Sequence, residues 1–299
     1  MSRKLTPIRC TPQYYHKIWG GGRLAPTGGD KQIGEVWLLS ALAGQETPTE
    51  GDDYEGASLD ALVTRYGDRL LGQGQTARCG GAFPLLIKLL DAATDLSVQV
   101  HPLPENGGKD EIWYFLETEP MSADALRSAI ERGDLMHYLH WEPVRSGEAI
   151  ALPAGTIHAL GAGSMLIEVQ DTSDTTYRLY DYDRVDDEGT KRPLHIEEAL
   201  RSATLEPHKL DARLLPLDTP RFVCHEVIAT PDSSQFITTE GTSCAILVGI
   251  SGSLLLSRDD TEPWQLAPHE ALLLPAETLP MRVAPGEGKA LMITLTPAE

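Results

Sequence analysis

Short apolar runs separated by the turn-forming residues Gly, Pro and Asp recur along the whole chain. This regular interruption limits the folds that the chain can adopt. The 27 glycines and 21 prolines suit many short strands joined by tight turns. With 299 residues, the chain has ample length for a well-buried core. The sequence therefore predicts a mainly β protein with a few helices.

Three stretches have the pattern of helices. Residues 58–66 begin with Ser58, a candidate N-cap, and carry apolar residues at i, i+3 and i+4. Residues 122–133 repeat this pattern and end at a glycine. The third predicted helix covers residues 195–201.

The segment Ser97–His101 is the most informative strand for function. In a strand, Ser97, Gln99 and His101 face one side, and the apolar residues between them face the other. A buried polar face of this kind needs a partner, and a metal ion bound by nitrogen and oxygen is the best one available.

Two later segments supply further candidate ligands. Glu111 leads one face of a strand over residues 111–116, and His158 follows the Pro-Ala-Gly turn at 153–155. Two imidazoles, a carboxylate and an amide oxygen leave a bound ion with positive charge and an open position, as catalytic zinc requires. A set of two histidines and one carboxylate also suits non-haem iron, so the ligand types leave the metal open.

The spacing of these residues resembles a known superfamily. Residues 147–158 follow the pattern Gly-x5-Pro-x-Gly-x2-His, which resembles the second signature of the cupin β-barrels. In place of the first signature stands Gln99-x-His101, with Glu111 as the later carboxylate. This ligand order resembles that of the type I mannose-6-phosphate isomerases, in their short bacterial form.

Four further segments carry the same resemblance, which extends from about residue 10 to the C-terminus. They are Lys17–Gly21, Phe83–Asp91, Gly108–Tyr114 and Ile167–Asp181. Two features depart from the family pattern: the loop between His101 and Glu111 is shorter than usual, and Gly34–Ser40 matches imperfectly. Neither departure removes a proposed ligand, so both bear on substrate preference more than on catalysis.

The resemblance implies a cupin (jelly-roll) β-barrel enzyme that interconverts mannose 6-phosphate and fructose 6-phosphate through a cis-enediol. It implies one Zn²⁺ per chain, held by Gln99, His101, Glu111 and His158. Zinc would polarise the substrate carbonyl, and a general base would move a proton between C1 and C2. Glu168 alternates with apolar neighbours and is the predicted base; its alternative role is to orient a ligand histidine.

The resemblance also makes Arg178 the essential arginine, whose planar guanidinium suits developing negative charge or an anionic substrate. The alternative is a surface ion pair with Asp174 or Asp181. Ser97 and Lys109 are the predicted phosphate contacts.

Two aromatic residues are candidates for the sugar pocket. Trp19 and Trp113 have flat apolar faces that would pack on a sugar, and their alternative place is the protein core.

An internal repeat suggests two domains. Residues 148–156 reappear in similar form at 270–278, with Pro280 where His158 stands. We therefore expect a catalytic cupin domain over 1–205, with helical insertions near 50–75 and 120–140. Residues 206–299 would form a second, degenerate cupin-like β domain without metal ligands.

Charge and cysteine usage restrict the partners. The formal net charge of −19 repels nucleic acid and anionic lipid, so the expected partner is a small sugar phosphate bound in a local basic pocket. The four cysteines are scattered and no apolar run is long enough to span a membrane, which predicts a cytoplasmic protein. We expect it to be a monomer or a homodimer. The alternatives are a cupin metalloenzyme with another sugar or with iron or manganese, and a sugar-binding regulator without turnover.

Overall fold

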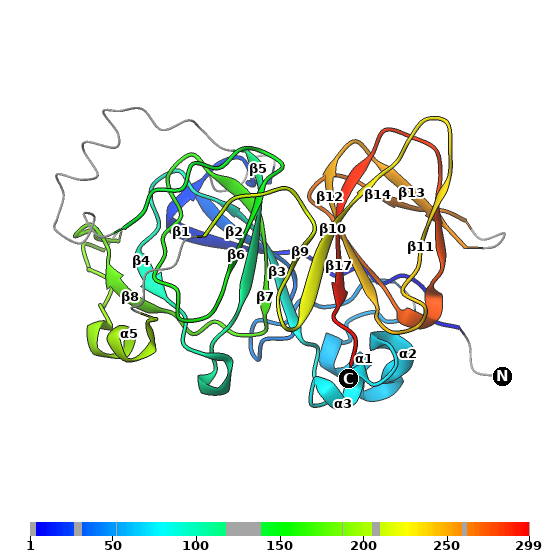
Figure 1. The fold of residues 1–299 in the computed structure, drawn as a ribbon, viewed down its shortest axis with the longest axis horizontal. Helices are drawn as coiled ribbons and strands as arrows, with labels where there is room; N and C mark the ends of the chain where they lie inside the picture. The colour runs from blue at the N-terminus through cyan, green and yellow to red at the C-terminus, as the bar shows by residue number, and fades with distance from the viewer. Residues whose placement is uncertain are drawn as a thin grey trace. The chain divides into compact units, whose positions relative to one another are not determined.

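The structure is a computed structural model that describes residues 4–26, 32–51, 53–117, 139–186, 188–204, 210–258 and 262–298. Strands dominate it and helices are few and short, which confirms the predicted mainly β class (Figure 1). The chain divides into two compact units. Unit 1 comprises Met1–Gln13, Trp37–Ile87 and Leu215–Glu299, and unit 2 comprises Tyr14–Val36 and Lys88–Leu214.

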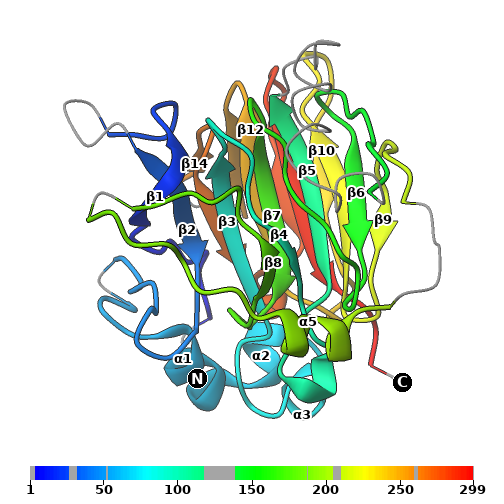
Figure 2. The ribbon, with the colours of Figure 1, turned by 90° about the vertical axis from the view of Figure 1, so that its left-hand side faces the viewer.

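Most residues of a six-stranded sheet belong to unit 2. Its strands are, in spatial order, β1 (Gln13–Gly21), β2 (Ile33–Leu39), β3 (Leu85–Asp91), β7 (Met165–Asp171), β5 (Glu111–Glu117) and β6 (Ala149–Leu152). Figure 2 shows β3, β7, β5 and β6 running side by side. Every residue of β3 and β7 is buried, so charged side chains on these strands must find partners inside the protein.

A two-stranded ladder completes the strands of unit 2. It pairs β4 (Val98–Val100) with β8 (Tyr177–Tyr180), and the helix α5 (Ile196–Ser202) contacts both strands. Val98 and Val100 are fully buried whereas Gln99 is half-buried, which agrees with the predicted alternation over 98–100; Ser97 and His101 are buried as well. The short 3₁₀ turn η1 (Pro104–Asn106) leads from β4 toward β5.

Unit 1 holds two sheets that share one core. The five-stranded sheet has the order β15 (Ala271–Leu274), β12 (Ala245–Ser251), β17 (Lys289–Leu295), β10 (Phe222–Ile228) and β9 (Leu217–Asp218). The four-stranded sheet has the order β11 (Gln235–Ile237), β16 (Met281–Val283), β13 (Leu254–Ser257) and β14 (Trp264–Leu266). Alternate residues of both sheets meet in one apolar cluster, as in a β-sandwich.

The predicted repeat corresponds to two strands of equal length. β6 and β15 each have four residues, and β15 is followed by the 3₁₀ turn η3 (Ala276–Thr278). Residues 215–299 lie in unit 1 together with 1–13 and 37–87, which the sequence analysis assigned to the first domain. Within the described ranges the strands form four open sheets and no closed barrel.

The helices lie largely where the sequence predicts them. α1 (Leu59–Tyr66) is followed in unit 1 by α2 (Asp68–Leu71) and α3 (Gln75–Arg78), and α5 matches the third predicted helix. The helix predicted at 122–133 lies outside the described residues. In the part of the chain that the structure describes, no helix is long and apolar enough to cross a membrane.

The N-cap of α1 provides a test of local stability. The Ser58 side chain accepts a hydrogen bond from the backbone N–H of Ala61 at 3.2 Å. Replacing Ser58 with Ala should lower the free energy of unfolding by about 1 kcal/mol, because one helix N–H loses its acceptor. Denaturant unfolding would measure this loss. Ser58→Asp, which keeps an acceptor, should stay close to the wild type.

Buried thiols predict an alkaline loss of stability. Burial raises the pKa of Cys10 and Cys244 from 9.0 to about 12. Between these values the unfolded thiols are ionised and the folded thiols are not, so stability falls as pH rises above 9. Replacing Cys244 with Ala should reduce the slope of unfolding free energy against pH by about 1.4 kcal/mol per unit between pH 10 and 11. An unchanged slope would show that this thiol ionises in the folded state.

Candidate functional site

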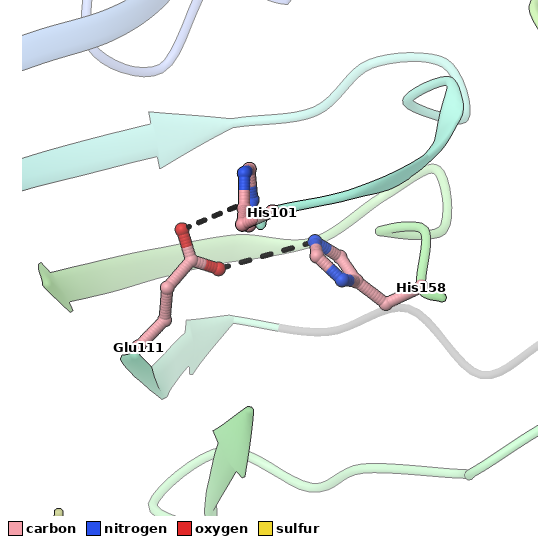
Figure 3. Close-up of side chains that lie close together, drawn as sticks. All are labelled: His101, Glu111 and His158. Atoms are coloured by element: carbon pink, nitrogen blue, oxygen red, sulfur yellow. Dashed lines mark ion pairs between the residues drawn. The ribbon is translucent and has the colours of Figure 1, made fainter. Parts of the chain in front are cut away.

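Three side chains that are far apart in sequence meet inside unit 2. His101 follows β4, Glu111 opens β5 and His158 follows the turn after β6 (Figure 3). One ligand atom from each residue lies within 4.8 Å of the others, and all three residues are buried. The Nε2 atom of His101 lies 3.4 Å from Glu111 Oε1, and that of His158 lies 3.9 Å from Glu111 Oε2.

The turn before His158 is tied to the strand that carries His101. Gly155 has a positive φ of 84°, and its N–H donates to the carbonyl of His101 at 2.8 Å. A Cβ at this position would lie 2.7 Å from Thr204 Oγ1, so glycine is required both by conformation and by space. The glycine of the sequence pattern thus brings the two histidines together.

Hydrogen bonds orient both imidazole rings. The Nδ1 atom of His101 lies 2.9 Å from the carbonyl oxygen of Thr175, and that of His158 lies 2.9 Å from the carbonyl oxygen of Thr156. A carbonyl can only accept, so each Nδ1 carries the proton and each Nε2 presents a lone pair. Neither Nε2 atom has a hydrogen-bond partner among the described residues. Buried unpartnered acceptors aimed at one carboxylate fit a metal ion.

The protonation states of His101 and Glu111 also suit metal binding. Burial lowers the pKa of His101 well below its usual range, and the charge of Lys109 acts in the same direction. Burial raises the pKa of Glu111, but the surrounding charges, led by the ammonium of Lys109 at 2.7 Å, together outweigh it and hold that pKa below its ordinary value. At neutral pH the site therefore offers a neutral imidazole at His101 and a carboxylate, the forms that bind metals.

Gln99 stands between two other candidate site residues. Its backbone N–H and carbonyl exchange hydrogen bonds of 2.9 Å with those of His158, and it pairs with Arg178 across the ladder of β4 and β8. Side chains of directly paired residues lie on the same face. The amide oxygen of Gln99 accepts a hydrogen bond from Ser97 Oγ at 3.1 Å. The structure thus places Ser97, Gln99, His158 and Arg178 together, as the proposed site requires.

A buried polar network lies beside the candidate ligands on the same sheet face. Gln170 pairs with Glu111 and Glu168 pairs with Trp113 in the register of β5 and β7. Trp113 donates its indole N–H to Glu168 Oε1 at 3.0 Å, and its ring makes an edge contact with His158. Trp113 therefore connects Glu168 with His158: it is hydrogen-bonded to the first and in ring contact with the second.

Lys88, on β3, is a site residue that the sequence analysis did not single out. Its Nζ atom lies 2.9 Å from Glu168 Oε2 and 3.0 Å from Gln170 Oε1. Burial opposes its charge, but the carboxylates of Glu168 and Glu35 outweigh that effect and raise the pKa of Lys88. The only signal in the sequence is one lysine within the apolar run 85–90.

Arg178 lies at the edge of an arginine cluster, which we define as Arg178, Arg184 and Arg192 with Asp181. Asp181 pairs with Arg184 and Arg192 at 2.6 Å each. Arg178 instead donates to Ser97 Oγ at 3.3 Å and to the carbonyl of Pro193 at 3.2 Å. Burial, followed by the charge of Arg192, lowers the pKa of Arg178. Three guanidinium groups around one carboxylate leave an excess of positive charge beside Ser97.

The remaining predicted site residues are more enclosed than expected. Lys109 is 3% exposed, and its ammonium lies between Glu111 and the amide oxygen of Gln170, so its phosphate role stays a prediction. Trp19 is 4% exposed and packs in an apolar cluster that also contains Trp113. Its place in a sugar pocket also stays a prediction.

The fold and the site define a class: a cupin-type β protein with a candidate metal centre of two histidines and a carboxylate. The family model of the type I phosphomannose isomerase catalytic domain matches residues 8–123. The mannose-6-phosphate isomerase of Streptococcus mutans serotype c is 39% identical over 220 residues, which cover 67% of this chain and 68% of that protein. The chain belongs to the type I phosphomannose isomerase family.

Solved structures agree with this assignment over nearly the whole chain. The mannose 6-phosphate isomerase of Bacillus subtilis superposes with a TM-score of 0.79 at 28% identity, covering 98% of this chain and 100% of that one. A zinc-bound mannose 6-phosphate isomerase gives a TM-score of 0.71 at 18% identity, with coverage of 98% and 100%, and shows the shared fold.

Proposed function

We propose that this chain is a metal-dependent isomerase that interconverts mannose 6-phosphate and fructose 6-phosphate. One observation carries the proposal: this chain, which belongs to the family, buries two imidazole Nε2 atoms around one carboxylate, and neither has a hydrogen-bond partner among the residues that the structure describes. An aldose–ketose isomerase needs a site that polarises a carbonyl and a base that moves one proton. The residues described above supply candidates for both tasks.

The residues fit one Zn²⁺ per chain. His101, Glu111 and His158 would hold the ion, with the amide oxygen of Gln99 as the fourth ligand. Nitrogen and oxygen donors of this kind suit zinc, and the hydrogen bonds to both Nδ1 atoms keep the rings in the binding orientation. When bound, the ion supplies a Lewis acid that polarises the substrate carbonyl.

Glu168 is the proposed general base. It lies on the sheet face that carries Glu111, and it would accept the proton from one substrate carbon and return it to the next. Trp113 donates to its Oε1 atom at 3.0 Å, and the ammonium of Lys88 forms an ion pair with its Oε2 atom at 2.9 Å, which together hold the carboxylate in place. The same contacts also suit the alternative role, in which Glu168 orients His158 through Trp113.

The anionic end of the substrate is proposed to bind at the arginine cluster. Asp181 neutralises only part of its charge, and Arg178 donates to a hydroxyl and a carbonyl rather than to a carboxylate. A phosphate group would give Arg178 a bidentate acceptor next to Ser97. The net charge of −19 repels a sugar phosphate, and this local positive charge would attract it.

We also propose a cytoplasmic location. The cysteines at 10, 79, 224 and 244 are all free thiols, which persist in a reducing compartment. Whether the protein is a monomer or a homodimer stays a prediction.

A coupled isomerase assay on mannose 6-phosphate tests the proposed function. It should be run on the purified protein before chelation, after chelation and after zinc is restored. We expect activity that the chelator removes and zinc recovers. No turnover by the zinc-loaded protein would refute the proposal, and would favour a binding role if the sugar phosphate still binds tightly. Turnover that consumes oxygen would point to an iron or manganese oxygenase.

A further inference from the structure

Gln170 occupies the centre of the buried network that joins the candidate ligands to the candidate base. It is fully buried on β7 and stands opposite Glu111 in the register of β5. Glu168, two residues earlier on β7, shares its face. Gln170 therefore separates the carboxylate proposed to bind metal from the carboxylate proposed to move a proton.

The Gln170 amide uses both of its ends. Its Oε1 atom accepts from Lys109 Nζ at 2.6 Å and from Lys88 Nζ at 3.0 Å. Its Nε2 group donates to the carbonyls of Ser173 at 2.5 Å and Asp171 at 3.2 Å. Ammonium groups only donate and carbonyls only accept, so the orientation of this amide is fixed by its four partners.

Each of the two lysines that contact Gln170 is already paired with a carboxylate, so no further charge is needed at position 170. Lys109 lies 2.7 Å from Glu111, and Lys88 lies 2.9 Å from Glu168, which makes two buried ion pairs. A neutral acceptor between the two ammonium groups can hold both without competing as an anion for either. A glutamate at this position would add a third buried carboxylate and place it against two carbonyl oxygens.

We propose that Gln170 is a positioning residue whose amide oxygen anchors both Lys88 and Lys109, so that each ammonium group is held against one carboxylate. Lys109 then orients Glu111 toward the histidines, and Lys88 then fixes Glu168. The inference rests on the proposed function, because it assigns Gln170 to a metal ligand on one side and to a base on the other. Without the shared acceptor, both lysine side chains are free to move and both carboxylates lose a fixed partner.

The first test is Gln170→Met, which keeps the length of the side chain and removes its acceptor and donors. Contacts that orient metal ligands are worth about 10- to 100-fold in metal affinity or activity. We expect the zinc dissociation constant, measured by competition with a chelating dye, to rise by about that factor. With saturating zinc, kcat should fall by about 10-fold or more while KM changes little, because the arginine cluster is intact. Gln235→Met, on the exposed edge strand β11, is the matched control and should leave both quantities unchanged.

A double-mutant cycle with Lys88 separates positioning from a general loss of packing. If Gln170 acts through the lysine, Gln170→Met should cost much less in kcat when Lys88 is already Met. Equal losses in both backgrounds would overturn the proposal. Gln170→Glu is a second variant in case Gln170→Met does not fold. We expect it to lower kcat as well, because its charge draws both lysines to itself, and wild-type zinc affinity and kcat in this variant would also overturn the proposal.

The zinc measurement keeps this inference distinct from the proposed function. If the wild type binds zinc but does not isomerise mannose 6-phosphate, the proposed function fails. The effect of Gln170→Met on zinc affinity would still report on the arrangement of Lys109 and Glu111.

Discussion

Replacing His158 with Ala should leave a folded protein without zinc and without isomerase activity. His158 supplies one of two Nε2 lone pairs at the site, and the remaining imidazole, carboxylate and weakly binding amide oxygen of Gln99 would hold zinc poorly. Loss of the ion removes the group that polarises the substrate carbonyl, so kcat/KM should fall by a factor on the order of 10³ or more. Metal analysis of the purified variant and the coupled assay measure the two losses separately.

His140→Ala is the matched control for this experiment. The His140 side chain is 64% exposed and pairs with Glu142 at 3.1 Å, so its loss should change neither zinc content nor turnover. A His158→Ala protein that keeps one zinc per chain would refute the ligand role of His158. Zinc loss with full activity retained would refute the metal dependence of the reaction.

Replacing Arg178 with Ala should give the opposite combination, in which zinc stays bound and turnover collapses. The guanidinium contacts Ser97 and the Pro193 carbonyl and none of the proposed metal-binding atoms. Loss of a charged donor that contacts the substrate typically costs about 10²- to 10³-fold in kcat/KM. Arg178→Lys should recover only part of this loss, because an ammonium group cannot bind a phosphate in the bidentate manner.

Arg201→Ala tests whether any nearby positive charge would serve. Arg201 lies on α5, and its side chain is 68% exposed, so we expect wild-type kinetics from this variant. Unchanged kinetics in Arg178→Ala itself would remove Arg178 from the site. Loss of zinc in that variant would show that it supports the metal centre rather than the substrate.

Local sequence patterns predicted the strands that carry the site. The alternation over 98–100 and the Pro-Ala-Gly turn depend on residues next to one another, and the structure contains both. The N-cap serine likewise predicted the start of α1. Such features are readable because the backbone geometry of a few residues determines them.

Contacts between distant residues could not be read in the same way. Lys88 and Gln170 are 82 positions apart, and nothing local indicates that a lysine in an apolar run will meet an amide on another strand. The pairing of Gln99 with Arg178 includes a register shift at Val98, which depends on the partner strand. The sequence also did not indicate that Asp181 would pair with Arg184 and Arg192 instead of Arg178, because these ion pairs depend on how the loop after β8 folds.

Unit 1 combines segments from both ends of the chain, and this limits the order in which the newly synthesised chain can fold. Ile8 forms a bridge with Leu273, so the first strand-like residues wait for a partner that is synthesised 265 positions later. Unit 2 ends at Leu214, and all its segments are available before β10 to β17 exist. During synthesis, the half that carries the candidate metal centre can therefore close first, while Ile8 still lacks its strand partner.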